Sequence, residues 1–150
     1  MNDSIIPAFG GLLTPDQVNS LRSVLDRIIP ADDYPSACDA GVDNYLAGQL
    51  RGDLSSFAGV YRDGLDGINR EAVNRFGVSF AELDSSARDS LLSLVEKGGV
   101  SVEWTVSPSE FFSLLVGHAM EGYYGTASPT ALESVGFDPR WTLRSPESVL

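Results

Sequence analysis

The sequence predicts an all-α protein: a single compact domain of about five helices with an irregular C-terminal tail. Apolar residues recur at helical spacing in successive segments, and most of these segments lie between a capping residue and a glycine or proline. A chain of 150 residues suits one domain with a real core. Pro7 and Gly10-Gly11 are expected to break any helix, which makes residues 1–13 an irregular arm. We therefore expect a helical domain over 14–125 and a tail over 126–150, packed on the domain or on a partner.

The first helix is expected to begin at a capping box and to end at a proline. Thr14 is placed to cap it, Pro15 takes the first helical position and Gln17 the third. Pro30 stops the helix because its ring and its missing N–H disfavour continuation. Between these ends, one apolar stripe faces the core: Val18, Leu21, Val24, Leu25, Ile28 and Ile29.

Aspartates and glycines bound the next two predicted helices. Asp39 is expected to cap a second helix of about ten residues that ends at Gly52. Asp53 is expected to cap a third, which ends at Gly77. Its apolar face comprises Leu54, Phe57, Val60, Tyr61, Leu65, Ile68, Val73 and Phe76. At its glycines, Gly59, Gly64 and Gly67, we expect the close approach of another backbone, with a kink as the alternative.

Two further helices complete the prediction. The fourth starts at Asp84 or Ser85, after a hinge turn over 80–84, and ends at Gly98. Residues 100–106 alternate like a strand but have no partner strand, so we expect an extended connector. The fifth starts from Ser107-Pro108, with Glu110 as the third residue of a second capping box. It is apolar nearly all round, which favours a central position.

Charge and composition exclude several classes of partner. The formal net charge of -11 at pH 7 argues against nucleic acid and anionic lipid, which need clustered Lys and Arg. No apolar run approaches the roughly 18 residues that a membrane-spanning helix needs, so membrane insertion is not expected. The N-terminal residues carry neither a positively charged n-region nor twin arginines, from which we expect a cytoplasmic protein.

His118 is the first candidate for chemistry. It lies among apolar neighbours in the fifth helix, and Glu121 follows one turn later. The pair could orient His118 as a general base, or it could be a structural ion pair. A hydrogen-bonded core or interface histidine is the alternative that we favour. His118 and Glu121 are accordingly the candidate catalytic residues, although the sequence demands no catalysis.

Metal and cofactor sites find little support in the sequence. The chain has one cysteine and one histidine, so Cys38 and His118 cannot supply a zinc site of the usual kind. Asp32-Asp33 with Asp39 form an acidic turn without the alternating spacing of a calcium loop. No glycine-rich nucleotide-binding motif is present. We expect no metal and no cofactor in this chain.

Aromatic side chains gather toward the last third of the sequence. Tyr and Trp are favoured at protein interfaces because one end of each is apolar and the other polar. The alternative is that most of them fill the core, and for Trp141 the two alternatives are evenly balanced. The candidate partner-binding residues are Tyr123, Tyr124, Phe137, Trp141 and Trp104.

An ordered set of short motifs resembles the gluconate 2-dehydrogenase subunit 3 family. The set covers residues 12–125 and comprises Leu13-Thr14, Leu25, Ile28-Ile29-Pro30-Ala31-Asp32-Asp33, Pro35, Ala40-Gly41-Val42, Phe76-Gly77, Phe80, Leu83, Phe111-Phe112, Leu115, His118 and Glu121-Gly122-Tyr123-Tyr124-Gly125. Two features depart from the family pattern: the twin-arginine signal is missing, and residues 126–134 are unrelated to the Tyr-Gly-Gly-Asn-rich segment that often follows the aromatic helix. These departures place an exporting role in question.

The resemblance implies a function that the residues alone do not show. Family members are small helical partners of a large FAD-containing subunit of the glucose-methanol-choline type, and some complexes add a cytochrome c subunit. The expected function is therefore a non-catalytic small subunit that binds and stabilises a sugar or glycoside oxidoreductase in a hetero-oligomer. FAD is expected in the partner. The alternative is a small stand-alone enzyme with His118 as general base.

Overall fold

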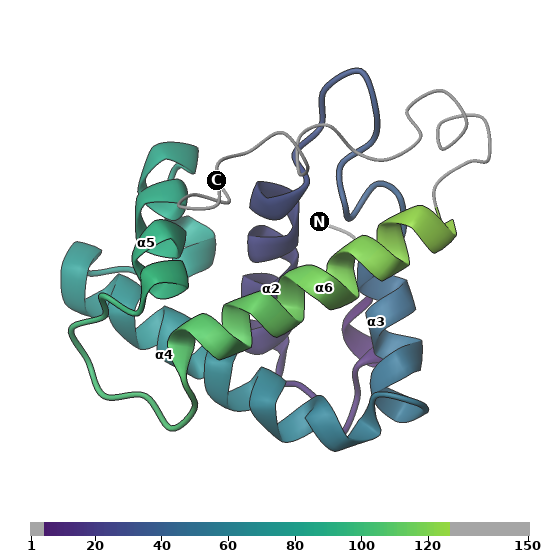
Figure 1. Ribbon diagram of the computed structural model, residues 1–150, viewed down its shortest axis with the longest axis horizontal. Coiled ribbons are helices and arrows are strands. Elements are labelled where there is room, and N and C mark those ends of the chain that lie inside the picture. Colours follow the sequence, from purple (N-terminus) through teal and green to yellow (C-terminus); the bar gives the residue numbers. More distant parts are fainter. Residues whose placement is uncertain (1–4, 127–150) are drawn as a thin grey trace.

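The computed structural model describes residues 5–126, and this part of the chain is all-α, as predicted (Figure 1). Its α-helices are α1 (Ile5–Ala8), α2 (Pro15–Ile28), α3 (Val42–Arg51), α4 (Ala58–Phe76), α5 (Ser85–Lys97) and α6 (Pro108–Thr126). Two short 3₁₀ turns, η1 (Ser55–Phe57) and η2 (Phe80–Glu82), flank α4. No strand occurs within the described range. The tail predicted over 126–150 lies outside that range from residue 127 onward.

The helices form one bundle around a shared core. Both α2 and α6 pack against α3, α4 and α5. In Figure 1, α6 crosses in front of α2, with α5 on one side and α3 on the other. The prediction of a central fifth helix is confirmed, because α6 buries much of its length. Its buried apolar residues are Phe111, Phe112, Leu115, Val116, Ala119 and Tyr123.

The predicted starts of the first and fourth helices and the predicted end at Gly77 are confirmed, and at the start of α6 Glu110 N donates to Ser107 Oγ at 3.3 Å, one half of the predicted capping box. Gln17 N donates to Thr14 Oγ1 at 3.2 Å, and Thr14 N donates to Gln17 Oε1 at 2.9 Å, which completes the capping box. Ala87 N donates to Asp84 Oδ1 at 2.8 Å at the start of α5. Gly77 ends α4 with a φ of 81°, in the left-handed region that favours glycine.

The predicted caps of the second and third helices are wrong. Helix α3 starts after Gly41, which has a φ of 88° and provides no side-chain cap. Asp39 lies in the preceding turn, where its N–H donates to Ser36 Oγ at 3.1 Å. Asp53 also lies outside a helix, because η1 intervenes and α4 begins only after Phe57. In both places, a tight turn occupies the residues that the sequence pattern assigned to the helix start.

The N-terminal arm belongs to the core, contrary to its prediction as an irregular segment. Helix α1 includes Pro7, which a helix tolerates in its first turn because the first N–H groups have no intrahelical partner. Phe9 is fully buried. Arg51 holds the arm from α3, with donor–acceptor distances of 2.9 Å to the carbonyl of Ala8 and 2.7 Å to that of Gly10.

At two glycines of α4 an aromatic ring packs against the helix. The expectation that another backbone approaches there is wrong for these two. A Cβ atom at Gly64 would overlap the ring of Phe111, and one at Gly67 would lie 2.5 Å from the Trp104 ring. At Gly59 the same atom would meet only the Arg62 side chain, at an ordinary 3.6 Å. The missing side chains therefore let α6 and the connector before it lie flat on α4.

The connector between α5 and α6 is anchored by one buried carboxylate. Glu71 of α4 is 1% exposed. Its Oε1 accepts hydrogen bonds from the backbone N–H groups of Ser101 and Val102, each at 2.7 Å. Its Oε2 accepts from Arg75 Nε at 2.8 Å. The prediction of a connector rather than a sheet over 100–106 is confirmed.

Candidate functional site

His118 lies in the interior, between α6 and α4. It is 7% exposed. Its Nδ1 atom is 2.8 Å from the hydroxyl of Tyr61, and the two rings are nearly parallel, with an interplanar angle of 6°. Phe57 meets the imidazole edge-on, with ring centroids 5.3 Å apart. The histidine is thus enclosed by aromatic rings and hydrogen-bonded across the bundle.

Burial keeps the side chains of Tyr61 and His118 neutral. It lowers the pKa of His118 below its ordinary value, and the charge of Glu121 opposes this only in part. Burial, with smaller contributions from Glu121 and Tyr45, raises the pKa of Tyr61. In the tautomer that carries its proton on Nε2, the Tyr61 hydroxyl donates to Nδ1 of His118.

Glu121 does not pair with His118. Its side chain is exposed, and no hydrogen bond or ion pair joins the two residues in the described part of the chain. A spacing of three residues brings Glu121 onto a neighbouring position of α6, but Nδ1 of His118 faces Tyr61. The geometry agrees with a hydrogen-bonded core histidine and offers no orienting carboxylate for a general base.

The titration of His118 tests this environment. We expect its midpoint, followed by NMR of the ring protons, to lie below 6.5, and the chain's single histidine makes the signal unambiguous. Because the folded state resists protonation, the free energy of unfolding should fall as the pH drops below about 6.5. Tyr61→Phe should cost about 1 kcal/mol through the lost hydrogen bond. A midpoint at or above 6.5 would contradict a buried neutral imidazole.

Three of the aromatic residues proposed to contact a partner are buried or half-buried and make contacts within the chain. Trp104 is half-buried and covers Gly67. Tyr123 is 4% exposed, and its hydroxyl donates to the carbonyl of Pro35 at 2.9 Å. Tyr124 is half-buried and meets the Tyr123 ring edge-on. Their role in partner binding stays a prediction.

The remaining aromatic candidates, Phe137 and Trp141, lie outside the described residues. For them the choice between core and interface stays open.

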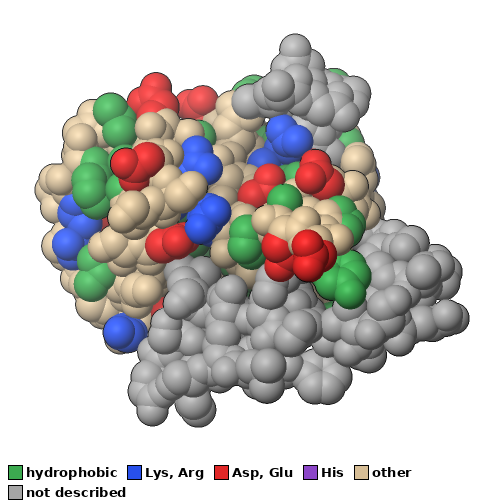
Figure 2. Space-filling view, turned by 90° about the horizontal axis from the view of Figure 1, so that it is seen from above, with side chains coloured by type: hydrophobic (Ala, Val, Ile, Leu, Met, Phe, Trp, Pro, Cys, Tyr) green, Lys and Arg blue, Asp and Glu red, His purple; other side chains and the backbone are tan. Residues whose placement is uncertain are grey.

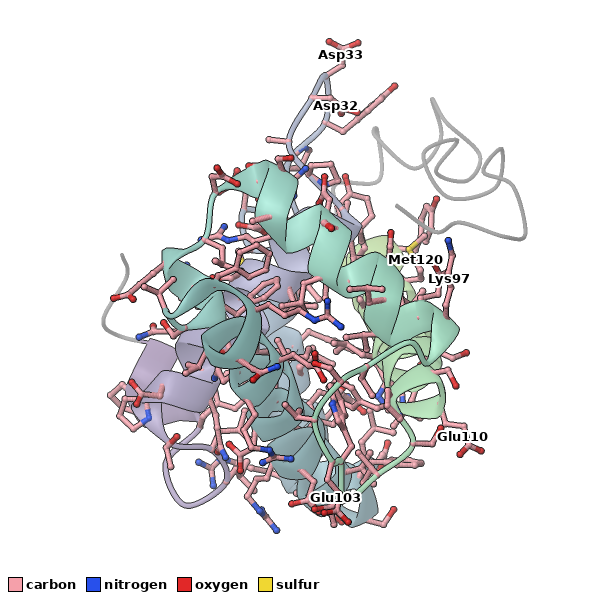
Figure 3. The ribbon with its side chains drawn as sticks, turned by 90° about the vertical axis from the view of Figure 1, so that its left-hand side faces the viewer. Asp32, Asp33, Lys97, Glu103, Glu110 and Met120 are labelled. Carbon is pink, nitrogen blue, oxygen red and sulfur yellow. The ribbon has the colours of Figure 1, made fainter. Side chains whose placement is uncertain are left out.

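The acidic turn and the cysteine have structural explanations. Asp32 Oδ1 accepts from Tyr34 N at 2.9 Å, so the turn caps itself. Figure 3 shows Asp32 and Asp33 at the tip of this turn, on the opposite side of the molecule from Glu103. Burial, with nearby carboxylates, raises the pKa of the Cys38 thiol and makes it a poor nucleophile. The described residues contain no cluster of three metal-ligating side chains.

A polar groove, here named the α2 groove, runs along α2 where this helix faces α4, η2 and α5. It consists of three adjoining cavities of 570, 470 and 210 Å³. Asp16 and Asn69 line both the first and the second. Asn19 and Ala81 line both the second and the third. The shared residues make the three cavities one continuous surface feature.

The floor of the α2 groove is hydrogen-bonded within the chain. Gln17 Nε2 donates to Asp66 Oδ1 at 2.9 Å. Asn69 Nδ2 donates to Ser20 Oγ at 2.7 Å. These bonds tie α2 to α4, so the groove is a preformed surface rather than a gap between loose helices.

Comparison with known proteins identifies the family. A family model described as gluconate 2-dehydrogenase subunit 3 matches residues 15–142. The chain belongs to the gluconate 2-dehydrogenase subunit 3 family. The resemblance inferred from the ordered motifs is thereby confirmed. No curated protein and no solved structure matches.

Membership of the gluconate 2-dehydrogenase subunit 3 family indicates an accessory subunit of a dehydrogenase complex. Among the residues that the structure covers, no helix is long and apolar enough to cross a membrane. Figure 2 shows one face of the molecule, on which hydrophobic side chains are scattered among acidic and basic ones.

In this family member, the sequence pattern does not indicate the roles of two buried polar residues. The pattern places Tyr61 on an apolar face and gives no sign that its hydroxyl meets His118. Glu71 stands three residues after Ile68, on the buried side of α4. A carboxylate on an apolar stripe was the available signal, because such a group needs buried partners.

Proposed function

We propose that this chain is the non-catalytic small subunit of a FAD-dependent dehydrogenase complex. In this proposal it binds and stabilises a large sugar or glycoside oxidoreductase of the glucose-methanol-choline type, which carries the FAD. The observation that carries the proposal is the family match over residues 15–142, which includes every helix from α2 to α6. We propose that the complex can also include a cytochrome c subunit. We propose a cytoplasmic location for this chain.

The buried polar side chains that could serve catalysis are engaged within the fold. Tyr61 and His118 satisfy each other in the core, and Glu71 holds the connector. The alternative of a stand-alone enzyme with His118 as general base gains little from this geometry. The imidazole is almost fully buried, and its Nδ1 is already engaged by Tyr61.

Co-expression with a candidate flavoprotein dehydrogenase of the glucose-methanol-choline type tests the proposal. We expect a tag on this chain to retain the flavoprotein through size-exclusion chromatography. The bound flavoprotein should melt several degrees higher than it does alone, since a partner that binds only the folded state adds about 2.7 kcal/mol at 100 times its Kd. The control is the flavoprotein expressed alone. If the two chains never co-purify, and the flavoprotein is stable and fully active alone, the proposal fails.

A further inference from the structure

An exposed apolar edge adjoins the α2 groove. The large hydrophobic side chains exposed in the described part of the chain are Val73 at 54%, Phe76 at 44% and Val78 at 37%. Val73 lines the first cavity of the groove, and Phe76 follows three residues later on the same side of α4. Val78 comes just after Gly77, where the helix ends. We name these three residues the apolar edge.

The sequence pattern predicts that Val73 and Phe76 lie on the core-facing side of the third helix. The structure corrects this, because the buried face of α4 passes through Leu65, Ile68 and Ala72 instead. Two large apolar side chains thus remain exposed without a covering element among the described residues. Exposed apolar side chains that are grouped beside a polar groove are typical of an interaction site.

The basic side chains around the α2 groove are already engaged. Arg22 Nε is bonded to Asp43 at 3.0 Å. Arg88 donates to the carbonyl of Ala81 at 2.6 Å, and Arg70 donates to that of Glu103 at 3.1 Å. Their positive charges are therefore held against carbonyl and carboxylate oxygens of the chain itself.

Three acceptor side chains of the groove, unlike Asp66, Ser20 and Asp26, are not engaged within the described part of the chain. Asp16 and Glu82, which both line the second cavity, make no side-chain hydrogen bond or ion pair with any residue that the structure describes. Asn19 lines the same cavity, and its buried Oδ1 has no hydrogen-bond partner there either. The exposed carboxylates of Asp16 and Glu82 thus give the groove negative charge beside an apolar edge.

We propose that the α2 groove and the apolar edge form the docking surface for the large flavoprotein subunit. The complementary segment carries an apolar side chain that packs on Val73 and Phe76, and lysine or arginine side chains that bind Asp16 and Glu82. Apolar contacts beside a polar, charge-complementary rim are the usual composition of a protein interface. This inference rests on the proposed function for the identity of the partner.

The charge of the chain argues against a second copy of itself as the occupant. The sequence holds 10 Lys and Arg against 21 Asp and Glu. Two copies would bring like net charges together, which disfavours association. A partner segment rich in donors removes this conflict.

The apolar half of the surface is tested with Val73→Ala/Phe76→Ala in the full chain. Binding to the purified flavoprotein dehydrogenase is measured by biolayer interferometry. We expect Kd to rise at least tenfold, because the few central anchors that dominate an interface cost at least that much when truncated. The matched control is Leu114→Ala, which shortens a half-buried side chain at a separate apolar cavity of 360 Å³. Circular dichroism melting verifies that each variant folds.

The charged half is tested with Asp16→Asn/Glu82→Gln, against Glu103→Gln/Glu110→Gln as a control of equal charge change. At about 0.05 M salt we expect the first pair to raise Kd at least fivefold and the control to leave it unchanged. At about 1 M salt the difference should vanish. If flavoprotein binding stays within twofold of wild type for both groove variants, or if the controls weaken it as much, the inference is overturned while the proposed function stands. If the wild-type chain itself does not bind, the proposed function fails first.

Discussion

Replacing Glu71 with glutamine is expected to lower the free energy of unfolding by about 2–4 kcal/mol at neutral pH. The carboxylate is 1% exposed and accepts hydrogen bonds from Ser101, Val102 and Arg75. An amide of the same shape keeps one oxygen but places an N–H₂ group against donors. The Arg75 guanidinium also loses its ion-pair partner. The connector from α5 to α6 therefore loses its anchor on α4.

The pKa of Glu71 predicts the direction in which the free energy of unfolding changes with pH. Burial by itself raises the pKa of Glu71, but hydrogen bonds from Val102, Arg75 and Ser101 outweigh it and lower the pKa to about 2, from an ordinary value of 4.5. A carboxyl with a depressed folded-state pKa stabilises the fold fully above its unfolded value. That stability is lost as the pH falls from about 4.5 toward 2.

Urea denaturation of wild type and Glu71→Gln at two pH values measures the effect. The difference between the two proteins should narrow by about 1 kcal/mol between about pH 6 and about pH 3.5, because only wild type carries the group that titrates. Glu103→Gln is the matched control, since the Glu103 side chain is exposed. A difference that stays constant over this range would show that the charge of Glu71 is not what holds the connector.

The helix ends that were predicted correctly depend on local contacts. Thr14 bonds to Gln17 and Asp84 to Ala87, each within three residues, so the pattern of residue types contains the whole interaction. Asp39 and Asp53 are equally good capping residues by type. They fail as caps because hydrogen-bonded turns occupy these positions: Gly41 N donates to the carbonyl of Cys38, and Ser55 N donates to that of Gly52.

The contacts inside the candidate site were harder to predict from the sequence, because the residues that meet there are far apart in the chain. Tyr61 and His118 meet across 57 residues of sequence. Helical spacing suggests only Glu121, one turn away, as a polar partner for His118. The α2 groove depends on the relative placement of four elements, and nothing in the composition of α2 alone indicates it. The family, in contrast, could be inferred from the order of the motifs alone.

The glycines of α4 provide the second large prediction. Gly64→Ala and Gly67→Ala are each expected to lower the free energy of unfolding by about 1–3 kcal/mol, although alanine is the better helix former by roughly 1 kcal/mol. The added methyl group would overlap the ring of Phe111 at Gly64 and would lie 2.5 Å from the Trp104 ring at Gly67. Both glycines are buried, so the rings have to move.

Gly48→Ala is the matched control, because Gly48 lies inside α3 and a Cβ atom there would meet nothing within 4 Å. It should raise the free energy of unfolding by about 0.5–1 kcal/mol through helix propensity alone. Urea denaturation with Trp fluorescence measures all three variants. The changes at Gly64 and Gly67 need not add, since the two sites lie one turn apart. A stabilised Gly64→Ala would mean that Phe111 can repack at no cost, and α6 would then be held on α4 by its other contacts rather than by this close fit.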